Sequence, residues 1–224
     1  MKNLMRKVAV IVPVAAIILF TAVKVNAQTA EIGFRLMPTI SAFDMKTSSG
    51  GTVKGSANLG YGIGAFVGYN FTNNIGVQGE VMYSSITQKY TQESVERKVN
   101  LRYVNIPLLF SLNTGKTNAV NLNLVAGPQI GISVGSKVFT SGGDGTNQAM
   151  LTIKKGDLGV AYGAGVDFAL GSSGMARLGV GFRGVYGLLN ISDNNNSTTT
   201  NSFYVLDRTH IKTYSLYTGL SLLF

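Results

Sequence analysis

Apolar and polar residues alternate with a period of two in eight separate stretches of the chain. In the last stretch, Tyr214 to Phe224, the even-numbered positions are mostly large and apolar, and the odd-numbered positions are mostly small or polar. This alternation indicates β-strands with two different environments, because successive side chains of a strand point to opposite faces. The predicted strands cover residues 31–41, 59–71, 75–88, 100–112, 120–134, 157–170, 175–190 and 209–224.

The connections between these strands alternate between long and short. Tight turns are predicted at 72–74, 113–118 and 171–174, and longer polar segments at 42–58, 89–98, 135–156 and 191–207. An even number of strands with this alternation is typical of bacterial outer-membrane barrels. We therefore predict an all-β fold, an eight-stranded antiparallel up-and-down transmembrane β-barrel with short periplasmic turns and long extracellular loops.

The apolar face of the predicted strands carries almost no charge, so we expect it to face lipid. A soluble barrel would have the opposite arrangement, because its outer face meets water. Aromatic residues gather toward strand ends, where the aromatic girdles of membrane barrels lie. These residues are Tyr61, Tyr83, Tyr162, Tyr186, Tyr214, Phe71 and Phe224.

The N-terminal 27 residues have the pattern of a signal peptide. Lys2, Arg6 and Lys7 form a positive region, and the apolar run 8–23 follows it. Small residues before Gln28 suit cleavage after Ala27. We expect residues 1–27 to be removed and residues 28–224 to form the barrel domain in the cell outer membrane.

The charge and cysteine content narrow the choice of partners. Of the 19 lysines and arginines, four lie in the leader, which leaves 15 against 10 acidic residues, a net charge of about +5. These charges are spread over loops, so no nucleic-acid partner is expected. The exported chain has no cysteine, so its stability must come from something other than disulfides, such as a closed barrel.

Six charged residues occupy the predicted inward phase of the strands. Eight strands enclose a space about wide enough for side chains to fill, and buried charges there need partners. We expect a network that plugs the barrel, with a narrow path for ions or small solutes as the alternative. The six residues are Arg35, Glu80, Asp157, Asp167, Arg177 and Arg183.

Signals for catalysis or cofactors are weak. Asp157 and Asp167 could form a catalytic pair, but the chain offers no nucleophile beside them. Residues 179–184 match G-x-G-x-x-G inside a strand, where no helix follows to bind a phosphate. His210 is the only histidine, so neither a metal nor a cofactor is expected. We predict that the protein is not an enzyme.

Four short motifs of the chain are informative as a set. They are Tyr103-Val104-Asn105-Ile106-Pro107-Leu108-Leu109, Ala126-Gly127-Pro128, Asp157-Leu158-Gly159 with Gly163-Ala164-Gly165, and Tyr186-Gly187-Leu188-Leu189-Asn190-Ile191. In these motifs, residues 31–224 resemble the eight-stranded outer-membrane β-barrel family of Bacteroidetes, labelled PorT-like or "porin family protein". The resemblance implies an outer-membrane location without an assigned activity, and its PorT branch implies an accessory role in type IX secretion as an alternative.

The C-terminal strand also suggests how the protein is assembled. Leu220, Leu222 and Phe224 resemble the C-terminal signal read by the barrel assembly machinery. We expect a monomer, surrounded by outer-membrane lipid or lipopolysaccharide, that presents its surface loops in a structural or interaction role. An extracellular or secretion-system protein is the expected kind of partner.

Overall fold

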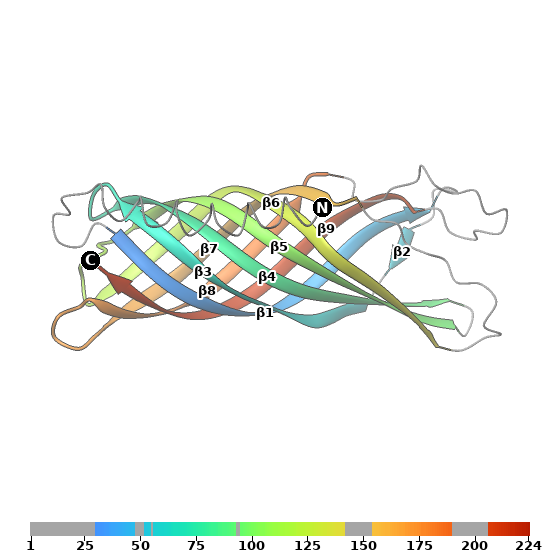
Figure 1. The fold of residues 1–224 in the computed structure, drawn as a ribbon, viewed down its shortest axis with the longest axis horizontal. Helices are drawn as coiled ribbons and strands as arrows, with labels where there is room; N and C mark the ends of the chain where they lie inside the picture. Colours follow the sequence, from blue (N-terminus) through green and yellow to red (C-terminus); the bar gives the residue numbers. More distant parts are fainter. Residues whose placement is uncertain (1–29, 48–51, 55, 93–94, 142–153, 190–205) are drawn as a thin grey trace, which may run out of the picture.

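In the computed structural model, eight long strands form one closed barrel (Figure 1). The structure describes residues 30–47, 52–54, 56–92, 95–141, 154–189 and 206–224. Within these ranges no helix is long and apolar enough to cross a membrane. The strands are β1 (Ala30–Thr47), β3 (Ser56–Asn70), β4 (Ile75–Gln92), β5 (Val95–Asn113), β6 (Val120–Ser141), β7 (Gly156–Leu170), β8 (Ala176–Gly187) and β9 (Leu206–Leu223).

Every neighbouring pair of strands is antiparallel, and β9 pairs with β1 to close the ring. At the seam, the Phe224 amide donates to the Ala30 carbonyl over 2.8 Å and the Ala30 amide to the Phe224 carbonyl over 3.2 Å. The three-residue strand β2 (Thr52–Lys54) pairs with the C-terminal part of β1, and β3 begins two residues after it. The predicted fold class is therefore confirmed.

The two faces of the barrel are the reverse of a soluble protein. Outward positions are large, apolar and exposed, as at Phe34 (66% exposed) and Leu216 (67%), whereas the inward Leu109 and Leu223 are completely buried. Because the outward face would cost free energy in water, it suits lipid. The predicted alternation of faces holds in all eight long strands.

Short turns join β3 to β4, β5 to β6 and β7 to β8 at one end of the barrel, where the C-terminus also lies (Figure 1). In the last of these turns Gly171 and Gly174 have φ of 73° and 65°, values that other residues adopt at a cost. All three predicted tight turns are present.

At the opposite end the strands are longer than predicted. β1 continues to Thr47, β4 to Gln92 and β6 to Ser141, and β5 already begins at Val95. The sequences of β5 and β6 place charged residues (96–98) or apolar residues (138–139) at consecutive positions here, which interrupts the alternation that predicts a strand. The predicted long connection at 89–98 is therefore wrong, because β4 runs to Gln92 and β5 begins at Val95. Strand pairing there rests on backbone hydrogen bonds, which do not depend on side-chain polarity.

The predicted leader 1–27 and its cleavage site lie outside the described residues. The same is true of most of two predicted loops, at 142–153 and 190–205.

Candidate functional site

The middle of the barrel is crossed by an ion cluster centred on Glu80. Arg183 donates from Nη1 to Glu80 Oε2 over 3.2 Å and from Nη2 to Oε1 over 3.0 Å. Arg35 donates from Nη1 to the same Oε1. Glu80 lies on β4 and Arg183 on β8, which is halfway round the ring of strands. This cluster therefore bridges the full width of the lumen.

Arg35 is held in place by polar and aromatic neighbours. Its Nη2 lies 3.4 Å from the accepting Gln78 Oε1, and the Gln78 amide in turn donates to Glu80. The guanidinium carbon lies 4.1 Å from the centre of the Phe66 ring and 4.9 Å from that of Tyr217. Two ring faces and a carboxylate thus compensate the removal of this cation from water.

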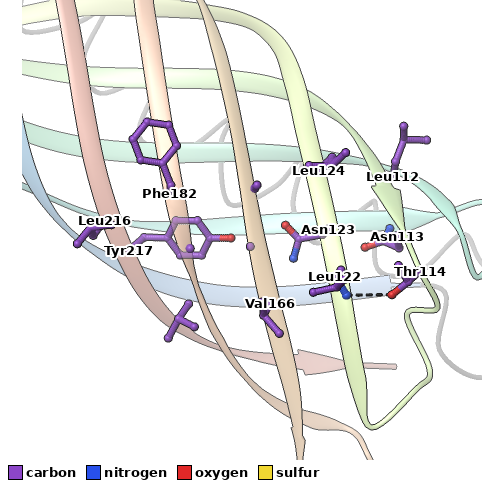
Figure 2. Close-up of a pocket in the computed structure, with 14 residues that line it drawn as sticks. Leu112, Asn113, Thr114, Leu122, Asn123, Leu124, Val166, Phe182, Leu216 and Tyr217 are labelled. Carbon is purple, nitrogen blue, oxygen red and sulfur yellow. Dashed lines mark hydrogen bonds between the residues drawn. The ribbon is translucent and has the colours of Figure 1, made fainter.

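Glycines on two strands make room for Tyr217. Its ring reaches from β9 across β8 toward β7 (Figure 2). A Cβ added at Gly165 would lie 2.0 Å from the Tyr217 hydroxyl oxygen, and one at Gly181 2.6 Å from its ring. The same region of the wall forms a mainly apolar pocket of about 920 Å³. Outward residues such as Leu122, Leu124 and Phe182 line it together with the inward Asn113, Asn123 and Tyr217.

A second charged layer lies inside the barrel near the short turns. Lys116, from the turn between β5 and β6, places Nζ 2.9 Å from Glu31 Oε2 and 3.1 Å from Asp167 Oδ2. Burial favours the neutral amine, but the two carboxylates outweigh it and raise the pKa of Lys116 above its ordinary value. Lys116 therefore stays charged at neutral pH.

The turn that carries Lys116 is fixed by hydrogen bonds to the neighbouring turn. The Lys116 amide donates to the Asn73 carbonyl over 2.9 Å, and the Thr117 amide to Asn73 Oδ1 over 2.9 Å. Asn74 Nδ2 donates to the Asn113 carbonyl over 2.9 Å. These contacts hold the turn across the mouth of the barrel.

Asp167, on β7, is the carboxylate at which strand side chains join the second charged layer. Asn121 and Asn123 donate to its Oδ2 over 3.1 and 3.0 Å. Arg177, which is fully buried, does not reach this carboxylate. Its Nη2 instead donates to the backbone carbonyls of Asn118 (2.9 Å) and Asp167 (3.4 Å).

The two aspartates proposed as a catalytic pair are far apart. Asp157 and Asp167 are ten residues apart on β7, which corresponds to ~33 Å. Asp157 lies toward the long-loop end, where its Cβ and Asn105 both approach Gly131. This separation excludes a dyad. Within the described part of the chain, no three histidine, aspartate or glutamate side chains are grouped to hold a metal.

Between the Glu80 cluster and the long-loop end, the lumen contains a cavity of about 60 Å³. That volume accommodates about two water molecules, at ~30 Å³ each. Its lining includes the buried Tyr103 hydroxyl and Arg183 Nε, which have no hydrogen-bond partner among the described residues.

The structure thus brings Arg35, Glu80 and Arg183 into one cluster, but places Asp167, Arg177 and Asp157 elsewhere. Glu31 and Lys116, which complete the second charged layer, were not among the predicted site residues. Glu31 shares the inward odd phase of Arg35 and was detectable from that phase. Lys116 lies in a turn, where strand alternation gives no direction for its side chain.

Known proteins give the same fold. Residues 26–193 match the family described as outer membrane protein beta-barrel domain. The barrel is similar to OprG from Pseudomonas aeruginosa, with 15% identity, 88% of this chain and 97% of that chain covered, and a TM-score of 0.52. Neisserial surface protein A has 14% identity and a TM-score of 0.49, with 89% of this chain and 100% of that chain covered. No curated protein is significantly similar in sequence. Because the family match spans most of the sequence, the chain belongs to the outer membrane protein β-barrel domain family and is a protein of the outer membrane.

Proposed function

We propose that this protein is a closed, non-enzymatic barrel whose function lies in the segments that it presents at the cell surface. The observation that carries the proposal is the position of Glu80, which is bound by arginines of β1 and β8 across the lumen. With Lys116 bound to Glu31 and Asp167 nearer the short turns, the interior contains two successive charged layers. A barrel filled in this way is a rigid support and not a conduit.

The same proposal covers the partners. We infer a monomer, inserted by the barrel assembly machinery through Leu220, Leu222 and Phe224, that meets an extracellular or secretion-system protein. Support for surface presentation comes from the connections between β6 and β7 and between β8 and β9, which are longer than the three short turns and join strand ends opposite the termini of the barrel, whereas the link between β4 and β5 is short. Membership of the PorT-like barrels of Bacteroidetes is part of the proposal and rests on the four motifs of the sequence taken together, none of which selects the branch linked to type IX secretion.

Epitope tags test the presentation of the long connections. One tag is inserted within 194–200 and a matched tag within the turn 171–174. Antibody on intact cells is expected to label the first tag only, and both after the outer membrane is permeabilised. Labelling of the turn tag on intact cells would contradict the proposed orientation.

Deletion of the gene tests whether the surface role belongs to secretion. Unchanged export of secreted proteins is expected if the barrel serves only as a surface support. Loss of type IX export, restored by the intact gene, would replace the display role with an accessory role in secretion.

A further inference from the structure

The cavity between the Glu80 cluster and the long-loop end is lined by hydrogen-bond donors that the described residues leave without acceptors. Tyr103 on β5 and Arg183 on β8 are each only 3% exposed. The Tyr103 hydroxyl and Arg183 Nε have no hydrogen-bond partner among the described residues, and both side chains line the cavity. Because burying a polar group without a partner is costly, these two groups point to a bound molecule that accepts hydrogen bonds.

The cavity wall also offers an acceptor. The Thr39 hydroxyl donates to the Met37 carbonyl over 2.9 Å. Since a hydroxyl has one proton, the Ser215 hydroxyl, 2.7 Å from that of Thr39, is the donor in the contact between them. Ser215 lines the cavity, and its oxygen lone pairs are therefore available to a molecule that donates.

A glycine brings a carboxylate to the same cavity. A Cβ added at Gly131 on β6 would lie 3.4 Å from Cβ of Asp157 and 3.5 Å from Cδ1 of the Tyr103 ring. The absence of a side chain at Gly131 thus lets residues of β5 and β7 approach each other across β6. Asp157 lines the cavity on the side toward the long-loop end.

The charges at the cavity identify its occupant. Glu80, Asp157 and Arg183 line it, and Arg35, which is bound to Glu80, adds a second positive charge. Two cations thus balance two carboxylates, so an ion among them would lose its hydration without a counter-charge. Water both donates and accepts, which suits hydroxyl, guanidinium and carboxylate groups together. The cavity of about 60 Å³ has room for about two such molecules at ~30 Å³ each.

We propose that two water molecules bind in this cavity and join Asp157 to the Glu80 cluster. Arg183 Nε donates to one of them, which donates in turn to Ser215 Oγ. The second bonds to the Tyr103 hydroxyl and donates to the Asp157 carboxylate. Asp157 thereby becomes a fourth charged member of the network of Arg35, Glu80 and Arg183. The inference goes beyond the proposed function, since it does not depend on what the surface segments bind.

The sign of the effect of Tyr103→Phe tests whether the cavity holds water. The readout is the temperature at which the folded, faster-migrating band of the refolded protein is lost on gels. With water bound, the substitution removes a hydrogen bond, and the midpoint is expected to fall by roughly 2–4 °C. Without water it would remove a buried hydroxyl that has no partner, and a rise of the midpoint would overturn the inference.

Tyr83→Phe is the matched control, because it removes a tyrosine hydroxyl from the outer wall, where the Tyr83 ring lies 6.4 Å from that of Tyr61. It is expected to shift the midpoint by less than half as much. An equal fall in both variants would overturn the inference, because the loss would then be general to tyrosine hydroxyls of this barrel.

A crystal structure of the refolded protein tests the occupant directly. Two density peaks are expected, one within hydrogen-bond distance of Arg183 Nε and one of the Tyr103 hydroxyl, with no anomalous signal there after soaking with bromide or rubidium. An empty cavity, an anomalous peak inside it, or a direct hydrogen bond from Tyr103 to Asp157 would each overturn the inference. None of these results bears on the surface role, which the epitope tags test separately.

Discussion

At the residue scale, Glu80 is the side chain on which the middle of the barrel depends. Two arginines from different strands share its carboxylate, and all three side chains are almost completely buried. Removing the acid leaves two cations without compensation in a region of low dielectric. A buried charge that loses its partner destabilises a protein far more than the intact pair stabilises it.

We therefore expect Glu80→Gln to lower the free energy of unfolding by about 3–5 kcal/mol. The measurement is urea unfolding in vesicles, followed by the mobility of the folded band. Replacing Arg35, Glu80 and Arg183 together by methionine is the control, and it should recover much of the loss because no buried charge remains. A Glu80→Gln variant as stable as the wild type would show that the cluster contributes little.

Tyr217 and Gly165 provide a second test at this scale. Gly165→Val places a side chain where the Tyr217 hydroxyl lies, so a loss of about 1–3 kcal/mol is expected. In a Tyr217→Ala background the same change should cost much less. Gly79→Val is the control, since nothing lies within 4 Å of a Cβ there. Equal losses at the two glycines would contradict the packing described for Tyr217.

The inward phase of the charged residues could be predicted from alternation, but their partners could not. Arg177 and Asp167 lie on adjacent strands, yet the Asp167 carboxylate is bound by Lys116 from a turn. The choice depends on the stagger of the strands and on where a turn folds, neither of which is encoded in a period of two.

At the element scale, the lipid-facing parts of the strands could be predicted and their outer ends could not. Within the membrane one face is apolar and the other is not, so alternation is visible in the sequence. Beyond the membrane the outer parts of β5 and β6 place charged residues (96–98) or apolar residues (138–139) at consecutive positions, so the period of two is interrupted there. The predicted loops were for this reason too long.

The C-terminal end of the closing strand β9 is predicted to be needed for assembly of the barrel. Deletion of Phe224 removes both backbone hydrogen bonds to Ala30 and the last residue of the proposed assembly signal. The amount of the variant without Phe224 at the cell surface is expected to fall below that of a variant lacking residues 196–200. Quantitative antibody labelling measures both, and equal levels of the two variants would refute the role of the C-terminus.

At the scale of the whole molecule, the fold combines an apolar outer wall with a charged interior. Lipid contacts remove the need for an apolar core, so the interior can hold ions that bind one another across the lumen. The layers at Glu80 and at Lys116 lie at different depths and use different strands. The proposed closure of the lumen therefore does not depend on either layer alone.

Single-channel conductance in a planar bilayer tests this closure most directly. Folded wild-type protein is expected to give no steady conductance steps, because both charged layers cross the lumen. A variant with alanine at Arg35, Glu80, Arg183 and Lys116 should conduct if it still shows the heat-sensitive shift in gel mobility of a folded barrel. Steady steps from the wild type that Asp167→Ala abolishes would contradict the account, since the charges would then line a path and not block one.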